Sequence, residues 1–350
     1  MKASFISTAT LLNSAHSTVA RTQADLTKAN IEINKGRYAD VGLELGYKTA
    51  ATLDLRQQVD DITEQQLRNN LTNVRVTDSQ NALNQIRSDG EAFLALIAPG
   101  KLTDGSGGVV AQAAASKLAA FIGQMNATTA GQFLFSGINS AQRPLADYES
   151  TPQSAAKTAF LQAFQTAFNF APGTQPGASQ ITPAQMKSFL DGPVTTLFAD
   201  SQWGSTWSSA SNTNVRNEIG SGETPETSTN ANVQAFRQLA MIYTVGSSIG
   251  LASLAPATQS VVYESMRSVA GVATIGVTQI HADLGTVEAR ITSLGKQLDA
   301  RKNILTEGFA SLEKVDVAEA KSRVDSLTTL LQISYSLTSQ TRKLSLIDYV

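Results

Sequence analysis

Hydrophobic residues near the amino terminus recur at a fixed interval of seven positions. They are Phe5, Leu12, Val19, Leu26 and Ile33, and small or hydroxylated residues stand between them at Thr8, Ala15, Thr22 and Ala29. Such a repeat is typical of a coiled-coil seam, so it predicts one amphipathic helix with a narrow apolar stripe. Lys28 and Glu32 lie one helical turn apart on it, and Gly36 is the expected stop signal.

A second helix with a thin apolar stripe is predicted at the carboxyl terminus, with Asp316 as its N-cap. Its apolar residues follow two registers, first Val317, Ala320, Val324, Leu327 and Leu331, and then Leu330, Ile333, Leu337, Leu344 and Ile347. Stripes this thin bury too little area to offset the entropy of ordering a helix, so we expect both terminal helices to be largely disordered in the monomer. This arrangement is typical of a subunit whose terminal helices become ordered when it packs against neighbouring subunits in a polymer.

Apolar residues resume helical spacing in two long inner segments, which we expect to pack antiparallel as rods. The first, Thr49 to Ala98, has a stripe that includes Leu55, Val59, Ile62, Leu67, Leu71 and Val74. The second starts at Pro256 and continues through Val277, Ile280, Leu284, Val287, Ile291, Leu294 and Leu298. Gly42 and Gly46 predict a non-helical spacer before the first rod. An ordinary intramolecular bundle is the alternative explanation for the rods.

The middle of the chain differs in composition. A helix is predicted over Val110 to Met125, and the heptapeptide from Gly131 to Gly137 predicts a strand, because its aromatic residues alternate between glycines. Residues 146–229 hold six of the nine prolines, six of the 13 phenylalanines and both tryptophans. We therefore expect an inserted surface domain there, with a helix around Phe160, Phe164 and Phe168 and another starting at Thr182.

The predicted fold class is mainly α, with long antiparallel coiled-coil-like rods formed by both chain ends, a small β-hairpin, and an inserted α+β or β-rich middle domain. Three domains are expected. They are a terminal-helix domain of residues 1–40 and 315–350, a rod domain of residues 41–145 and 230–314, and the insert of residues 146–229.

Composition and charge restrict the partners. The 27 basic and 29 acidic residues are spread without runs, so neither nucleic acid nor a membrane surface is an expected partner. No apolar run is long enough to cross a bilayer, and the first residues lack the pattern of a cleaved secretory signal. There is no cysteine, which excludes disulfides and thiolate metal sites.

Catalytic chemistry has few candidates, and we expect no catalytic residue, no cofactor, no metal and no enzyme activity. His16 and His281 have no second histidine at metal-ligand spacing, so we expect both on solvated helix faces. Asp60 and Asp61 are neighbours on a helix and point about 100° apart, so they cannot share a proton. Trp203 and Trp207 are expected in the core of the insert, with ligand stacking as the alternative.

The helical arms, residues 1–145 and 230–350, resemble the flagellin family. Gly131 to Gly137, Gly-Gln-Phe-Leu-Phe-Ser-Gly, resembles a strand typical of its hook-associated members, and Leu344-Ser345-Leu346-Ile347 resembles the family's terminal leucine-rich seam. The usual helix exit with paired aspartates is reduced here to Asn34-Lys35-Gly36-Arg37 with a single Asp40. Val110 to Met125 lacks the Arg-rich pattern of filament flagellins, which favours a junction subunit.

The resemblance implies a non-enzymatic structural protein of the bacterial flagellum, located outside the cell and exported unfolded by the flagellar type III apparatus. Implied partners are the first hook-associated protein, flagellin, an export chaperone and further copies of itself in a ring of about eleven. The alternatives are a filament-building flagellin, a cytoplasmic coiled-coil scaffold, and an insert with its own catalytic or ligand-binding activity.

The candidate functional residues are those of the two terminal stripes, which together would form an assembly seam. They are Phe5, Leu12, Val19, Leu26, Ile33, Val324, Leu327, Leu330, Ile333, Leu337, Leu344 and Ile347.

Overall fold

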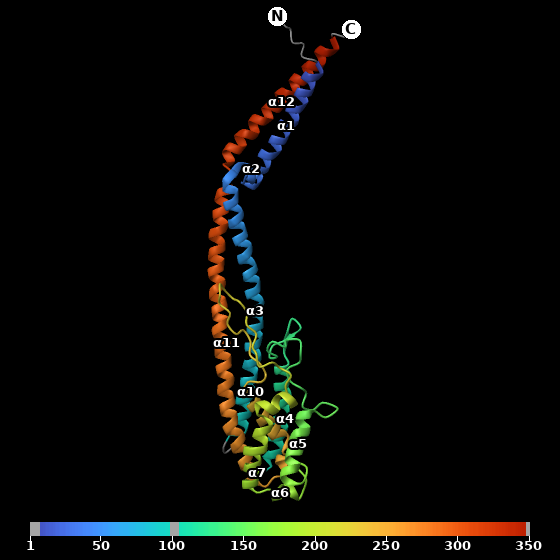
Figure 1. Cartoon of the computed structure of the whole chain (residues 1–350), viewed down its shortest axis with the longest axis vertical. Helices are drawn as coiled ribbons and strands as arrows, with labels where there is room; N and C mark the ends of the chain where they lie inside the picture. The colour runs from blue at the N-terminus through green and yellow to red at the C-terminus, as the bar shows by residue number, and fades with distance from the viewer. Residues whose placement is uncertain (1–7, 99–104, 348–350) are drawn as a thin grey trace. The chain divides into compact units, whose positions relative to one another are not determined.

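The computed structural model describes residues 8–98 and 105–347, and nearly all of the long elements are helices (Figure 1). The chain divides into two compact units. Unit 1 consists of Met1–Glu64 and Gln297–Val350, and unit 2 of Gln65–Lys296. The predicted fold class is confirmed, with long helices at both chain ends, one small antiparallel hairpin and additional elements in the middle.

In unit 1 the terminal helices α1 (Thr8–Lys35) and α12 (Val317–Ile347) pack against each other antiparallel. The direction follows from their contacts, since Gln23 pairs with Tyr335 and Glu32 pairs with Arg323. Gly36 ends α1 with a φ of 66°, a conformation that glycine adopts without strain. Asp316 caps α12 as predicted, because its Oδ1 accepts a hydrogen bond from the Ala318 amide at 2.8 Å.

The segment between α1 and the first rod differs from the prediction. It was expected to be non-helical, but it contains the short helix α2 (Val41–Leu45) and the 3₁₀ turn η1 (Gly46–Lys48). The physical reason is Asp40, whose side chain accepts a hydrogen bond from the Leu43 amide at 3.0 Å and caps α2. Gly46 has a φ of 52°, so one of the two spacer glycines ends the short helix.

The two predicted rods are α3 (Thr49–Leu96) and α11 (Pro256–Glu313), and each has residues in both units. They run antiparallel within each unit. In unit 2, Arg267 of α11 donates a hydrogen bond to the Ile97 carbonyl, just after the end of α3, and Thr77 bonds Glu288. In unit 1, Arg56 bonds Glu313.

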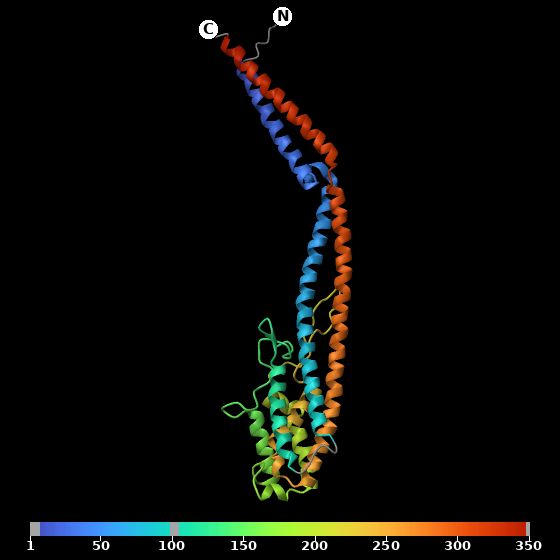
Figure 2. The same ribbon diagram turned by 180° about the vertical axis from the view of Figure 1, so that it is seen from behind.

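The core of unit 2 forms where α4 (Ser106–Met125) and α10 (Gln234–Ser248) join the rods, as Figures 1 and 2 show from opposite sides. Phe93 and Tyr243 meet edge to face with ring centroids 5.3 Å apart. The helices approach closely at Gly246, where an added Cβ would lie 2.6 Å from the Cβ of Ala114. Unit 2 is therefore packed tightly enough to require glycine at this crossing.

The hairpin after α4 is shorter than the predicted strand. Strands β1 (Thr128–Thr129) and β2 (Gln132–Phe133) pair antiparallel across a turn in which Ala130 and Gly131 both have positive φ. The expected strand to Gly137 stops early because its remaining backbone groups pair elsewhere. The Phe135 carbonyl accepts a hydrogen bond from Ala231, and the Ser136 carbonyl accepts one from Ser211.

Residues 146–229, the expected insert, lie wholly in unit 2 and are helical in their first two thirds. The elements are α5 (Ala155–Phe168), α6 (Gly177–Gln180), α7 (Pro183–Phe189), the π-helical turn η2 (Leu190–Val194), α8 (Thr195–Leu197) and α9 (Asp200–Thr206), and the 3₁₀ turn η3 (Leu251–Ser253) follows α10. The two helices predicted around Phe160 and from Thr182 are present. Side chains of this segment share one hydrophobic cluster with α3, α4, α10 and α11, and the three-domain division stays a prediction from composition.

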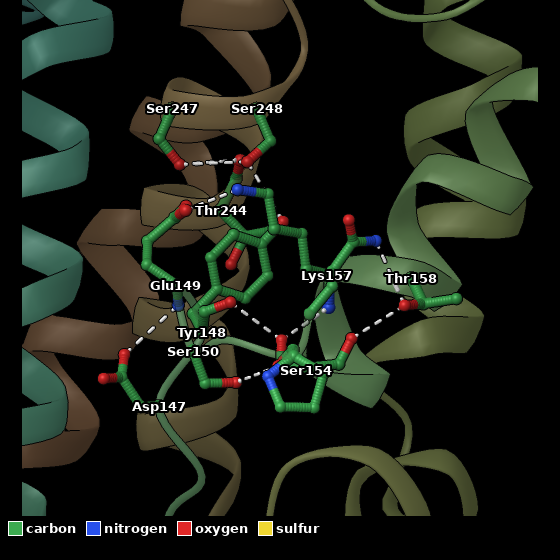
Figure 3. A network of polar contacts seen from close by, with 12 residues as sticks. Asp147, Tyr148, Glu149, Ser150, Ser154, Lys157, Thr158, Thr244, Ser247 and Ser248 are labelled. Carbon is green, nitrogen blue, oxygen red and sulfur yellow. Dashed lines mark hydrogen bonds and ion pairs between the residues drawn. The ribbon is translucent and has the colours of Figure 1, made fainter.

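Tyr148 connects the start of this segment to α10 (Figure 3). Its hydroxyl lies 3.0 Å from the Ser248 hydroxyl, and its carbonyl accepts a hydrogen bond from Ser154 at 2.8 Å. Its ring stacks on Trp207, which stacks on Trp203, and the Lys157 ammonium, ion-paired with Glu149, lies 5.8 Å from the Tyr148 ring centroid. Both tryptophans are buried, as expected for core residues.

The close crossing at Gly246 leads to a stability prediction. Gly246→Ala should destabilise unit 2 by about 1–3 kcal/mol, because the new methyl group would overlap Ala114. Gly123→Ala is the matched control, since this helical glycine has nothing within 4 Å of the added Cβ and alanine favours the helix by about 0.5–1 kcal/mol. Urea denaturation of both variants checks this, and equal effects would contradict it.

Alkaline pH should destabilise unit 2 through two buried tyrosines. Burial raises the pKa of the Tyr148 and Tyr243 phenols above the ordinary value of 10.0. The unfolded chain therefore loses these protons first, so the free energy of unfolding is fully retained below about pH 10 and falls as the pH rises further. The measurement is the urea midpoint at pH 8 and pH ~11.

In that experiment the double variant Tyr148→Phe/Tyr243→Phe should lose much of the alkaline decline. The control is Tyr47→Phe, whose side chain is 88% exposed, and it should decline like the parent. An unchanged decline in the double variant would show that other groups cause the effect.

Candidate assembly surface

The amino-terminal heptad forms the inner seam of the α1 and α12 pair. Thr22 and Ala29 are buried, and the side chains at the neighbouring seam positions are half-buried, namely Ala15, Val19, Leu26 and Ile33. Because the pair is narrow and its seam residues are small, few of its side chains leave water completely. Phe5 lies outside the described residues, and Leu12 lies in α1 at a position whose side chain is not described.

The apolar residues of α12 separate into two faces. Most of the first register packs toward α1, since Ala320 is buried and Val324, Leu327 and Leu331 are half-buried, whereas Val317 is 48% exposed. The shifted register points outward, and we call Leu330, Ile333 and Leu337 the outer stripe. These three side chains are 46 to 60% exposed and follow the spacing of one helix face. Leu344 and Ile347 belong to α12 by backbone, and their side chains are not described.

An exposed stripe of large aliphatic side chains on a helix is a candidate surface for contact with another protein. The residues of the predicted assembly seam therefore lie on two different surfaces. Val19, Leu26, Ile33, Val324 and Leu327 lie within the helix pair, whereas the side chains of the outer stripe are exposed.

Two buried carboxylates stand where the chain leaves α1 and where it enters α12. We call residues 36–40 and 313–316 the crossover, because their backbones pair there, with Tyr38 donating to the Glu313 carbonyl and Val315 donating to the Gly36 carbonyl. Glu313 is 2% exposed, and Arg56 donates to both of its oxygens at 2.6 and 2.7 Å. Such two-oxygen contacts from one guanidinium are among the strong hydrogen bonds of proteins.

Glu32 is the second buried carboxylate, at 4% exposure. It accepts a hydrogen bond from the Ala39 amide at 3.2 Å, and its other oxygen lies 3.3 Å from Arg323 of α12. The sequence placed Glu32 one helical turn from Lys28, and in the structure Glu32 pairs with Arg323 from the opposite end of the chain. Glu32 lies three residues after the seam residue Ala29. A charged residue at that edge of a seam was the sequence signal that could have indicated its burial.

The inner rod α3 exposes apolar side chains that the sequence had assigned to a packed stripe. Leu67, Leu71 and Val74 are 52 to 63% exposed, whereas Asn69 and Thr72 on the same helix are buried. These three residues share one exposed face, whereas Ile62 of the same predicted stripe is buried. Sequence spacing identifies residues that share a face, and it does not say which face is covered.

The residues considered for catalysis are not brought together. His16, Asp60 and Asp61 are exposed, as expected. His281 is half-buried instead of solvated, and its Nε2 is buried with no hydrogen-bond partner among the described residues. In the ranges 8–98 and 105–347, no three side chains of the ligating types gather as a metal site, and no helix has the length and apolar content to span a bilayer.

Comparisons with known proteins match both helical ends of the chain. A family model described as the bacterial flagellin N-terminal helical region matches residues 6–140, and the bacterial flagellin C-terminal helical region matches residues 268–350. A structure from Vibrio parahaemolyticus, described provisionally as a flagellar hook-associated protein, is similar in fold with a TM-score of 0.51 and 11% identity, over 76% of this chain and 97% of that chain. No curated protein matches by sequence.

The crossover leads to a prediction about Arg56. Arg56→Met should destabilise unit 1 by about 1.5–3 kcal/mol, because it leaves the buried Glu313 carboxylate without its main donor. The matched control is Arg87→Met, whose partner Glu91 is half exposed one helical turn away and which should cost about 0.5 kcal/mol or less. Thermal unfolding followed by circular dichroism compares the two, and equal shifts would contradict a special role for the crossover.

Proposed function

Because the chain belongs to the flagellin family, with a helical region of that family at each end, it is a structural subunit of the bacterial flagellum, and we propose that it stands at the junction of hook and filament. The observation that carries this proposal is the second apolar face of α12. One face packs on α1, and the outer stripe of Leu330, Ile333 and Leu337 is left for neighbouring subunits. A subunit that presents such a stripe gains stability by assembling.

Two sequence features favour the junction over the filament. The segment Gly131 to Gly137 resembles a strand typical of hook-associated proteins, and α4 lacks the Arg-rich pattern of filament flagellins, with Lys117 as its one charged residue. The similar fold of the Vibrio parahaemolyticus protein, described as hook-associated, supports the same choice. The role would be that of the third hook-associated protein.

In this role the partners would be the first hook-associated protein on one side and flagellin on the other, with copies of the chain forming a ring of about eleven. The protein would act outside the cell, after export by the flagellar type III apparatus with a chaperone. The two terminal helices would be largely disordered before assembly, because their thin inner seam stabilises the pair weakly. Assembly would cover the outer stripe and order them.

A filament-building flagellin is the second candidate. The observation in its favour is that both matched family models describe flagellin itself. Such a subunit should form long fibres from purified protein when seeded, whereas a junction subunit should stay unpolymerised by itself. This seeding assay separates the two functions without any change to the chain.

The proposal predicts the result of deleting the gene in its source bacterium. Cells should carry bare hooks, and flagellin should appear as soluble protein in the medium, because it is exported and finds no platform. Immunoblots of sheared filaments and of medium, with electron microscopy of the cells, measure this. Normal filaments would contradict the junction role, and a missing flagellin band above an intact hook tip would identify the chain as the filament subunit.

Complementation of that deletion tests the outer stripe. The variant Leu330→Gln/Ile333→Gln/Leu337→Gln should be exported but should restore few filaments, since its inner seam is unchanged and its outward face has become polar. The matched control Ser322→Gln/Ser336→Gln/Ser339→Gln alters three exposed residues of the same helix and should restore filaments fully. Full restoration by both variants would remove the outer stripe from the proposal.

A further inference from the structure

A two-stranded loop lies along α3 and α11 in unit 2, and we call residues 212–230 the strap. Its two arms pair through Arg216 with Glu226 and through Gly220 with Glu223, and Gly222 with a φ of 74° lies in the turn. Figures 1 and 2 show it as the yellow loop beside the two rods. The strap is therefore a narrow hairpin-like segment that lies on the rods as a separate layer.

The tip of the strap is held on α3 mainly by its backbone. The Ile219 carbonyl accepts a hydrogen bond from the Asn69 side chain at 2.8 Å, and the Glu218 carbonyl accepts one from Gln65 at 3.1 Å. The Ile219 side chain is fully buried. Asn69 is also buried, so the strap supplies the acceptor that this amide needs in the interior.

On α11 the tip is held by one ion pair and one backbone contact. Arg290 donates to both oxygens of Glu223 at 2.8 Å, and both side chains are substantially exposed. An added Cβ on Gly220 would lie 3.3 Å from Leu294, so the strap backbone packs directly on that side chain. Exposed ion pairs contribute little to stability and weaken with salt, so the fixed anchors are Ile219 and Asn69.

The base of the strap is fixed far more firmly than its tip. Asn230 donates to the Asn214 side chain at 2.8 Å, and Asn232 donates to the Asn212 side chain at 2.6 Å. Asn232 also accepts a hydrogen bond from buried Trp203 at 3.0 Å. The strap is thus anchored to the core at one end and ends in a tip with a single fully buried apolar side chain.

We propose that the strap is a clamp that holds α3 to α11 near Asn69 and Arg290, and that its tip opens and closes locally while the core of unit 2 stays folded. The imbalance between base and tip supports this. A segment with few buried apolar contacts and exposed polar anchors opens at lower free energy than the core around it. The tip contacts also lie near the two limits of unit 2, which are Gln65 on α3 and Lys296 on α11.

The absence of native cysteine allows a direct test by thiol labelling of the full chain. Ile219→Cys places a thiol at the buried position of the strap tip. Ile86→Cys places one in the core, at a buried isoleucine of α3. Under native conditions the first should react with a thiol reagent at least tenfold faster than the second, because local opening exposes only the strap tip. Equal rates would mean that the strap opens only with global unfolding, and would overturn the proposal.

A second pair of variants tests the anchors. Asn69→Ala should accelerate labelling of Ile219→Cys severalfold, whereas Glu223→Gln and added salt should accelerate it by a smaller factor. None of these changes should alter labelling of Ile86→Cys. Unchanged labelling of Ile219→Cys in both variants would contradict the clamp. Circular dichroism of every variant, compared with the parent chain, establishes that the helices are intact when the rates are compared.

Discussion

The architecture of unit 1 depends on one constraint, which is that a helix with two apolar faces can cover only one of them with a single partner helix. In α12, the face with Ala320 and Leu327 packs on α1, and the face with Leu330 and Ile333 remains in water. The chain supplies no further helix for that second face among its described residues. The second face is therefore a surface suited to association.

The small residues of the inner seam raise a second problem, because they define register poorly. Ala29, Thr22 and Ala320 offer little shape for one helix to recognise on the other. Glu32 supplies the missing specificity, since it is buried in α1 and only certain positions of Arg323 on α12 satisfy its carboxylate. Buried polar groups that fix register at some cost in stability are well known in coiled coils.

Much of the helical fold could be predicted from the sequence because its signals are local. The heptad, the stop at Gly36 and the cap at Asp316 each act within a few residues, and the structure has them where expected. The predicted limits of α3 agree with the structure to within two residues, and the predicted start of α11 at Pro256 is correct.

The failures share a cause, which is that burial depends on partners far away in the chain. Leu71 is exposed and Asn69 is buried because the strap, some 150 residues later, brings a carbonyl to Asn69. Glu32 is buried because Arg323 comes from the opposite end. The spacing of the outer-stripe residues could be read from the sequence. That they point into solvent could not, because periodicity shows which residues share a helix face and not which face is covered.

The stacked tryptophans determine what spectroscopy can see in this protein. Trp203 and Trp207 are the two tryptophans of the chain, their rings lie 5.2 Å apart, and both belong to unit 2. Indole fluorescence therefore reports on unit 2 alone, whereas far-ultraviolet circular dichroism adds the helices of both units. Melting curves from the two probes separate if the terminal helices melt first, and a single transition temperature then describes neither unit.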